Sequence, residues 1–359
     1  MKQAYLKYYL TFLFTITVGI AFGASTPISY AARLLENKAR NYLKTKNEEQ
    51  YLKVLQEGIT KYPEDVYFIN DLIYYYQQQK PSEINNAMQL VNNLLTKKPN
   101  NKNYIINKAI VSVKMKRYSV AKTLLKDADL YRTDPAIAWY ITGEIAFDQG
   151  QYEEAINNFE KAIRLDNKDR YSNYGLGLSY SRQEKYKDAL KYYNKAIQLG
   201  LQDSKVYNDL GETYFELERN YEAISAFKKA ILLDPQNATA LHNLGFVYDE
   251  MLRYNDAINA FNKALKIDPK DLEAYKGLGS VYCEKKKYNE AIEACNKALQ
   301  IDSKDAEAYN CLGSIYCIMK RYEDAIAAFQ KALAINPAYS VASDNLKLAK
   351  EAQNKIKKK

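Results

Sequence analysis

The residue types that most often carry out chemistry are scarce in this chain. Its 359 residues include one histidine, His242, and four cysteines. A single histidine excludes a zinc or di-iron centre built from several histidines, and His242 would be the one conventional base for a serine or cysteine nucleophile. The sequence contains no His-Glu-x-x-His motif and no glycine-rich phosphate loop followed by Lys-Ser or Lys-Thr. We therefore predict a protein that is not an enzyme and that binds no cofactor or metal.

Composition and charge narrow the class of partner. Apolar residues make up 47% of the chain and charged residues 26%, a balance typical of soluble globular proteins. Eight prolines and 13 glycines are too few for a turn-dense β fold. The 52 basic and 43 acidic residues give a net charge of +9, which is dispersed apart from a C-terminal tail of lysines. Such a mild excess does not predict nucleic-acid binding, and we expect none.

Residues 1–24 have the layout of a targeting segment. Lys2 and Lys7 precede a run of about fifteen mostly apolar residues that ends at Phe22, and small residues follow around Ala24. The run is short for a bilayer span, which needs about 20 residues. We expect a signal peptide that exports the protein to the periplasm or envelope and is cleaved after residue 23 or 24. An uncleaved membrane anchor over residues 4–24 and a helix of the core are the alternatives.

Most of the remaining chain repeats one pattern every 34 residues, and four consecutive units begin at Ser204, Ala238, Leu272 and Ala306. Each unit has a Leu-Gly pair, a tyrosine three residues later, an alanine, an apolar residue four positions on, and a second alanine; most close with proline. The register continues upstream from residue 136 and, more weakly, from residue 102. Apolar residues three, four and seven apart predict two amphipathic helices per unit. One unit is too small to bury a core, so neighbouring units must stack.

This pattern, aromatic-x2-Leu-Gly-x2-Tyr followed by Ala-x3-Phe, Ala and Pro, resembles the tetratricopeptide-repeat (TPR) family over residues 136–339. The resemblance implies an all-α fold: a right-handed superhelical solenoid of antiparallel helix pairs, with about nine units. The expected organisation after the targeting segment is degenerate TPR-like units at 25–101, the TPR array at 102–339 and a capping helix with a basic tail at 340–359.

The resemblance also implies a concave groove lined by the first helix of each unit. At the five groove positions of the six clear units, nine of thirty residues are acidic and three are basic. A negative, partly aromatic groove on a net positive chain favours a peptide or protein surface that carries Lys or Arg and apolar groups. Charges that merely keep the groove soluble, with His242 a polar surface residue, are the alternative. The predicted partner-binding residues are Tyr140, Glu144, Phe147, Tyr171, Tyr174, Glu212, Phe215, Glu216, His242, Phe246, Asp249, Glu250, Lys276 and Glu284.

The cysteines allow three interpretations. Cys283 and Cys317 hold equivalent places in two units, Cys295 stands where other units have phenylalanine, and Cys311 lies on the next first helix. All four are small packing residues, or Cys295 and Cys311 form a disulfide if the protein is exported. A metal site is the third interpretation, although no Cys-x-x-Cys spacing supports it.

Together these features predict a non-catalytic scaffold or adaptor for protein–protein interaction in an exported or envelope compartment. Two other roles fit the same sequence. One is an assembly-factor adaptor attached to the membrane by its N-terminal segment. The other is a protein that recruits substrates for a separate enzyme, such as a glycosyltransferase.

Overall fold

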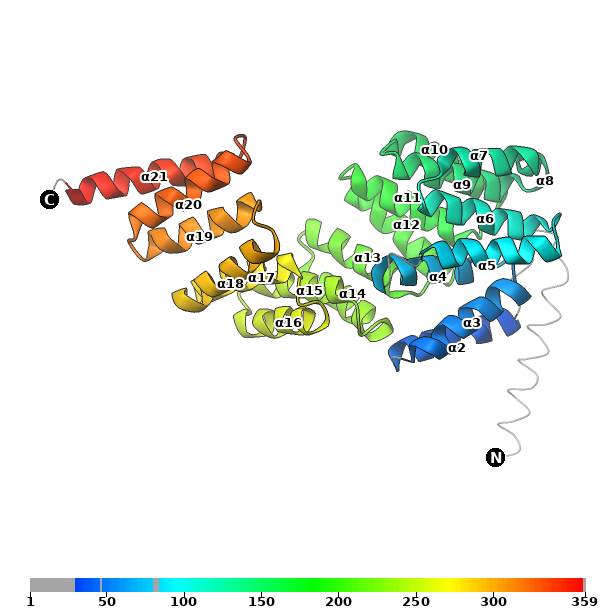
Figure 1. Ribbon diagram of the computed structural model, residues 1–359, viewed down its shortest axis with the longest axis horizontal. Coiled ribbons are helices and arrows are strands. Elements are labelled where there is room, and N and C mark those ends of the chain that lie inside the picture. Colours follow the sequence, from blue (N-terminus) through cyan, green and yellow to red (C-terminus); the bar gives the residue numbers. More distant parts are fainter. Residues whose placement is uncertain (1–29, 46, 80–83, 358–359) are drawn as a thin grey trace, which may run out of the picture. The chain divides into compact units, whose positions relative to one another are not determined.

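The computed structural model describes residues 30–45, 47–79 and 84–357, and all regular structure within these ranges is helical (Figure 1). The predicted all-α fold class is therefore confirmed. The predicted targeting segment, residues 1–24, lies outside the described residues. The chain divides into two compact units at the Leu201–Gln202 boundary, which we call the N-terminal unit and the C-terminal unit.

The N-terminal unit consists of consecutive helices that pack against one another in pairs. First helices of successive pairs also contact each other, as α4 with α6, α6 with α9, and α9 with α11. The helices are α2 (Tyr30–Lys44), α3 (Glu48–Lys61), α4 (Val66–Gln79), α5 (Ile84–Lys97), α6 (Lys102–Lys114), α7 (Tyr118–Asp127), the short α8 (Leu130–Thr133), α9 (Pro135–Asp148), α10 (Tyr152–Leu165), α11 (Arg170–Arg182) and α12 (Tyr186–Gln198).

The C-terminal unit repeats the same arrangement more regularly. Helices α13 and α14, α15 and α16, α17 and α18, and α19 and α20 form the pairs, and α21 packs on α20. Their bounds are α13 (Ser204–Glu216), α14 (Asn220–Leu233), α15 (Ala238–Glu250), α16 (Tyr254–Ile267), α17 (Leu272–Glu284), α18 (Tyr288–Ile301), α19 (Ala306–Ile318), α20 (Tyr322–Ile335) and α21 (Ser340–Lys357).

Local sequence sets the length of each first helix in the C-terminal unit. An Asp or Asn side chain caps the N-terminus by accepting a hydrogen bond from the backbone N–H three residues on, as Asp271 does from Ala274 at 3.0 Å. Such a cap stabilises a helix by about 1 kcal/mol. Two residues after the 13-residue helix ends, the chain turns through a residue in the left-handed region, for example Lys286 at φ 60°. The cap and the turn recur in each pair, which keeps the 34-residue register.

A phenylalanine packed on glycines explains the Leu-Gly pair of the repeat. The Phe261 ring of α16 lies between Gly245 of its own unit and Gly277 of the next. A Cβ atom at these glycines would lie only 2.6 and 2.3 Å from the ring. Phe159 sits in the same way between Gly143 and Gly175. Glycine is therefore needed because the aromatic ring occupies the space of its side chain.

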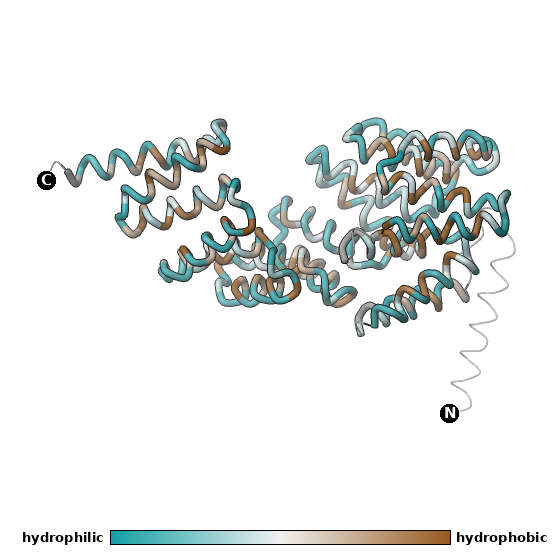
Figure 2. The backbone as a smooth tube through the Cα atoms, viewed as in Figure 1, coloured by the Kyte–Doolittle hydropathy of each residue, from teal (hydrophilic) through white to brown (hydrophobic). Residues whose placement is uncertain are grey.

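Hydrophobic and hydrophilic residues alternate along the helices, and the hydrophobic ones form the interior of the pairs (Figure 2). In the C-terminal unit the core includes phenylalanines of the second helices, such as Phe227, Phe261 and Phe329, each at most 1% exposed. None of the described helices is both long enough and apolar enough to cross a membrane.

Candidate protein-binding site

The predicted groove residues lie on the first helices of both units, and each set is described by itself. We call Tyr140, Glu144 and Phe147 of α9 with Tyr171 and Tyr174 of α11 the N-terminal face. The C-terminal face lies on α13, α15 and α17 and consists of Glu212, Phe215, Glu216, His242, Phe246, Asp249, Glu250, Lys276 and Glu284.

The residues of the N-terminal face are largely engaged within their own unit. Tyr140 is 4% exposed, its ring lies 6.3 Å from that of Tyr171, and its hydroxyl forms a hydrogen bond with Asn70 of α4. Burial raises the pKa of Tyr140 well above its ordinary value. Glu144 forms an ion pair with Lys114 of α6. First helices of earlier pairs thus contact the positions that were predicted to face a partner.

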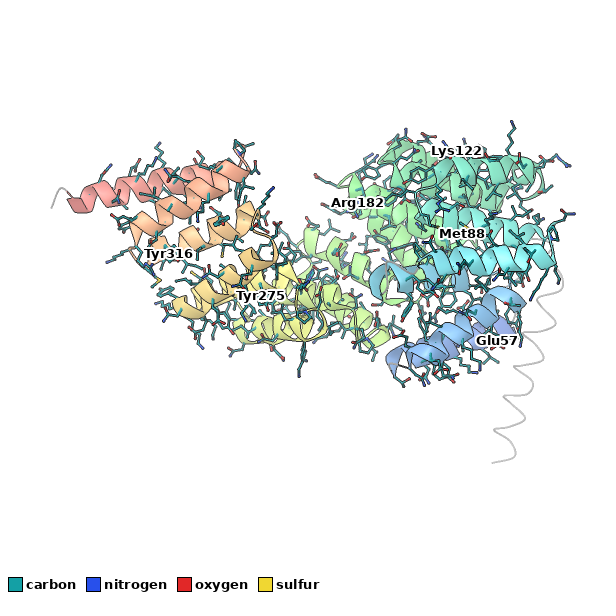
Figure 3. All side chains as sticks on the ribbon, viewed as in Figure 1. Glu57, Met88, Lys122, Arg182, Tyr275 and Tyr316 are labelled. Carbon is teal, nitrogen blue, oxygen red and sulfur yellow. The ribbon has the colours of Figure 1, made fainter. Side chains whose placement is uncertain are left out.

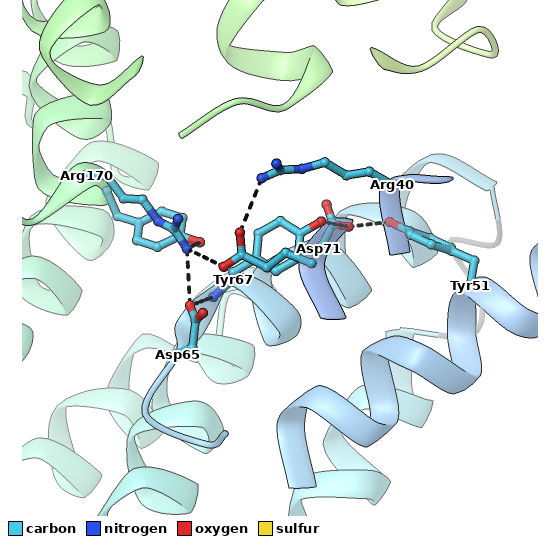
Figure 4. A network of polar contacts seen from close by, with 8 residues as sticks. Arg40, Tyr51, Asp65, Tyr67, Asp71 and Arg170 are labelled. Atoms are coloured by element: carbon cyan, nitrogen blue, oxygen red, sulfur yellow. Dashed lines mark hydrogen bonds and ion pairs between the residues drawn. The ribbon is translucent and has the colours of Figure 1, made fainter. Parts of the chain in front are cut away.

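Arg170, at the start of α11, forms ion pairs with distant helices of the N-terminal unit (Figure 4). Its Nη2 lies 3.1 Å from Glu36 Oε1 of α2 and 3.2 Å from Asp65 Oδ1, just before α4. All three side chains are at most 7% exposed. These ion pairs join positions 134 and 105 residues apart in the sequence. They hold the first two helix pairs against the fifth first helix of the described chain.

Aromatic and polar groups of α2, α3 and α4 surround this ion-pair cluster. Arg40 Nη2 lies 3.4 Å from the second oxygen of Glu36, and its guanidinium stands 5.4 Å from the centre of the Tyr67 ring. The hydroxyls of Tyr67 and Tyr51 both donate to Asp71 (Figure 4). Buried polar networks of this kind are stabilising only when their members are satisfied together, so the contact is specific.

Within this ion-pair cluster the pKa of the Asp65 carboxyl is raised. Burial raises the pKa of Asp65 to about 7; the Arg170 guanidinium opposes this rise and the Glu36 carboxylate adds to it. Burial is the largest cause because it penalises the charged form of the carboxyl, and repulsion from the nearby Glu36 carboxylate adds to it.

Sequence reasoning missed Arg170, Glu36 and Asp65. One signal was present, because Arg170 occupies the first position of its unit, where the other clear units have small or aliphatic residues. That signal marks Arg170 as unusual but does not identify partners more than a hundred residues away.

The C-terminal face has a different character, because its carboxylates are exposed. Glu216, Glu250 and Glu284 are exposed and form no ion pair with any described residue. Glu212 is also exposed and accepts hydrogen bonds from the amides of Asn208 and Asn243, both at 2.8 Å.

Asp249 lies among these carboxylates. Burial raises its pKa, and the nearby Glu284 and Glu250 carboxylates raise it further, while the Ser280 hydroxyl at 3.5 Å acts in the opposite direction. Repulsion between neighbouring carboxylates shows that negative charge is concentrated here.

The predicted aromatic residues of this face pack partly into the core. Phe246 places its ring edge-on against Phe261 at 5.1 Å, and Phe215 packs against the same core. Both keep part of their surface exposed. They provide apolar patches at the base of the face between the carboxylates.

The two basic residues of the face, His242 and Lys276, contact carboxylates that lie beside it. His242 Nδ1 lies 2.8 Å from Asp271 Oδ2, and the histidine side chain is 14% exposed. Lys276 Nζ lies 2.8 Å from Glu273, 2.7 Å from Glu307 and 3.5 Å from Asp305. These carboxylates raise the pKa of Lys276, against the effect of burial. The free charge of the face is therefore negative.

Outside this face, Tyr275 and Tyr316 project from α17 and α19 (Figure 3). Tyr316 is covered by the Arg321 guanidinium, 4.5 Å from its ring centre, and Arg321 also pairs with Asp324 at 2.7 Å. The same Arg-on-Tyr contact recurs at Arg219 and at other units. Tyrosines at this repeat position stabilise the repeat by packing against an arginine, which accounts for part of the high number of tyrosines, 34 in the whole chain.

The stacked helix pairs define the class of protein: a tetratricopeptide-repeat protein, as the repeat pattern predicted. The family model described as the Cilia and flagella-associated protein 70 C-terminal domain matches residues 107–353. The chain belongs to this family. No curated protein matches the chain in sequence.

Solved structures share the fold. The hetero-tetramer Cut9–Hcn1 of APC/C has a chain 19% identical, aligned over 92% of this chain and 78% of that one, with a TM-score of 0.55. A tetratricopeptide repeat protein from Parabacteroides merdae is 21% identical over 69% of this chain and 98% of its own, with a TM-score of 0.54. PilW, described as a type IV pilus biogenesis factor, is 17% identical over 59% of this chain and 99% of its own, with a TM-score of 0.55. The tetratricopeptide fold is typically a scaffold for protein interaction.

Proposed function

We propose that this protein is a non-catalytic scaffold that binds a basic peptide segment or protein surface on its C-terminal face. The observation that carries the proposal is the exposure of Glu216, Glu250 and Glu284 without a cationic partner among the described residues, while His242 and Lys276 are internally paired. Lys or Arg side chains of a ligand would supply the missing positive charge, and apolar ligand groups would contact Phe215 and Phe246.

The N-terminal face contributes less to this proposal than the sequence suggested. Tyr140 is buried and Glu144 is paired with Lys114, so neither offers a free group to a ligand. We therefore place the binding site on α13, α15 and α17 alone. Phe147, Tyr171 and Tyr174 remain predicted partner residues, each half-buried within the N-terminal unit.

A fluorescent peptide of alternating Lys and Leu tests the proposal, with a Glu-Leu peptide of equal length as the ligand control. Reversing Glu216, Glu250 and Glu284 to Lys should weaken binding of the basic probe at least tenfold, because three attractive charges become repulsive. Circular dichroism would verify that the variant is folded.

The matched control reverses Glu222, Glu290 and Glu293 to Lys on α14 and α18, the second helices of their pairs. It changes net charge equally but leaves the C-terminal face intact, so affinity should stay within about twofold. Equal loss in both triple variants would mean that only net charge matters. No binding of the basic probe by the native chain would favour carboxylates that merely keep the face soluble.

For the cellular location, we propose export to the periplasm or envelope, on the charged start, apolar run and small residues of 1–24. Membrane attachment through residues 4–24 is the second candidate, and a role in recruiting substrates to a separate enzyme is compatible with either. The intact mass of the native protein in soluble and membrane fractions separates the first two. Loss of the first 23 or 24 residues supports export, and a full-length mass in the membrane fraction supports an anchor.

A further inference from the structure

One contact between repeat units departs from the pattern of the others. In the other clear units an aromatic ring of the second helix, a phenylalanine or Tyr193, packs on a glycine of its own first helix, as Phe261 does on Gly245. In α18 the equivalent residue is Cys295, and the sixth residue of the next unit, which varies along the array, is Cys311. This contact therefore has no aromatic ring and brings two cysteines to one place.

The structure brings the two thiols together. Cys295 is fully buried, Cys311 is partly buried, and the Cys295 thiol donates a hydrogen bond to Cys311 Sγ at 3.1 Å. Both sulfurs face Gly279, where an added Cβ would lie 2.7 Å from Cys295 Sγ and 3.4 Å from Cys311 Sγ. The helix pair thus presents two sulfurs in contact, with a glycine that leaves them room.

We propose that Cys295 and Cys311 are a thiol–disulfide exchange site, at which a reversible disulfide cross-links α18 to α19. The co-reactant is an external disulfide, either a small molecule such as oxidised glutathione or an oxidoreductase. This site is independent of the proposed peptide binding on the C-terminal face.

The exchange is balanced in two steps. The Cys311 thiolate attacks the external disulfide, forming a mixed disulfide and releasing one external thiol. The Cys295 sulfur then attacks Cys311 Sγ, releasing the second external thiol and completing the protein disulfide. Two protein thiols are oxidised, one external disulfide is reduced, and the two protons are taken up by the two released thiolates.

The surroundings assign the attacking role to Cys311. The hydrogen bond from Cys295 lowers the pKa of Cys311, and the Lys276 ammonium lowers it further, although burial opposes them. The same hydrogen bond and burial raise the pKa of Cys295 far above its ordinary value. The thiolate is the reactive species, so attack begins at the partly exposed Cys311.

The other two cysteines are less suited to the same chemistry. Burial raises the pKa of Cys283 to about 11 and also raises that of Cys317. Among the described residues, no three His, Cys, Asp or Glu side chains form a group that could hold a metal ion. All four cysteines pack against the core, and the contact between the Cys295 and Cys311 sulfurs gives the disulfide interpretation a geometric basis of its own.

The cross-link would act where the core is small. The core cluster at this contact contains Ala291, Cys295, Leu312 and Ile315 as its buried members and has no phenylalanine. A disulfide between positions 16 residues apart lowers the conformational entropy of the unfolded chain. This stabilisation would offset the packing that is lost because no phenylalanine ring is present at this contact.

The test uses the full chain with Cys283 and Cys317 changed to Ser, so that only the proposed pair remains. The reduced, folded protein is incubated with oxidised glutathione and then alkylated, and intact mass is measured. We expect a mass 2 Da lower and no alkylation, with a bridge between the tryptic peptides that contain Cys295 and Cys311. The midpoint of thermal unfolding should rise by roughly 5 °C on oxidation and fall again with dithiothreitol.

A Cys295→Phe, Cys311→Gly variant is the matched control, because it restores the pairing seen at Phe261 and Gly277. Its unfolding midpoint should not respond to oxidant. The native four-cysteine chain should form the same Cys295–Cys311 bridge in the peptide map. Two free thiols after oxidation, stable glutathione adducts, or a bridge through Cys283 would each overturn the proposal.

Discussion

The first helices of the two units of the chain have different surroundings. In the N-terminal unit, Tyr140 and Glu144 contact the chain's own α4 and α6, and Arg170 joins α11 to Glu36 and Asp65. In the C-terminal unit, the equivalent helices carry exposed carboxylates. The first helices of the C-terminal unit are evenly spaced and capped by Asp or Asn, whereas those of the N-terminal unit are less regular and α9 has no side-chain cap.

The repeat register fixes where a side chain lies on its helix. It does not decide whether that side chain is available to bind a ligand. In the N-terminal unit, polar groups from distant helices satisfy one another and leave little for a ligand. In the C-terminal unit, His242 and Lys276 each contact carboxylates, and Glu216, Glu250 and Glu284 form no ion pair with a described residue. Whether a side chain is available to a ligand therefore depends on the charges that other helices place around it. Changing a few of these residues tests this comparison.

The largest effect is expected at Arg170. Changing Arg170 to Met leaves the buried Asp65 without a cationic partner and Glu36 with Arg40 alone, and should lower the free energy of unfolding by about 3–5 kcal/mol. Urea denaturation measures this, with Arg219→Ala as a control, because its exposed pair with Glu222 is worth less than about 1 kcal/mol. Adding Glu36→Gln and Asp65→Asn to Arg170→Met should recover much of the loss. Equal stability of the Arg170 and Arg219 variants would contradict the role given to the cluster.

The next effect is a pH dependence that originates at Asp65. The pKa of Asp65 is about 7 in the folded chain and near 3.8 when unfolded, so the folded state retains a proton between these values. The free energy of unfolding should therefore fall as pH rises from about 4 to 7, by at most about 4 kcal/mol from this group. Asp65→Asn cannot ionise and should gain stability relative to the native chain over this range. Denaturation at several pH values checks this, and parallel curves for the two proteins would refute it.

A smaller effect separates the two faces in binding. Glu144→Gln removes a carboxylate that Lys114 already neutralises, so affinity for the Lys-Leu probe should change less than about twofold, whereas reversing Glu216, Glu250 and Glu284 should weaken it at least tenfold. Fluorescence anisotropy at low salt gives both values. A tenfold loss in Glu144→Gln would mean that the N-terminal face also binds the probe.

The smallest effect is a gain at Lys276. Lys276→Met removes the cation that pairs with Glu273, Asp305 and Glu307, and so releases negative charge on the C-terminal face. Affinity for the basic probe should rise about two- to fivefold, and the gain should shrink as salt is added, because exposed charges are screened. A weaker affinity would show that Lys276 positions the face rather than neutralising it.

Much of the fold could be predicted from local patterns. The Leu-Gly pair and the phenylalanine at fixed spacing report a ring packed on a glycine, which is a contact within one unit or between neighbours. The capping residues before each first helix are equally local. Sequence alone also indicated the pairing of Cys295 with Cys311 as one of three interpretations, and their 3.1 Å contact gives that reading a geometry.

The candidate site was predictable only in part. The acidic positions of the C-terminal face were correctly placed on first helices, because helix register is local. The pairing of His242 with Asp271 was missed, since it depends on the packing of α15 against α17. His242 was predicted to bind a partner, with a polar surface residue as the alternative, and its side chain is 14% exposed.

By itself, the sequence determined the helix pairs, their 34-residue period and the sign of charge along the first helices. These properties follow from propensities, caps and contacts between near neighbours. Only the tertiary structure decided that Arg170 meets Glu36 and Asp65. It also decided that Tyr140 and Glu144 contact α4 and α6, while Glu216, Glu250 and Glu284 are exposed. The physical reason is that burial and ion pairing depend on which distant helices pack together, and a repeating pattern carries no information about partners 134 residues away.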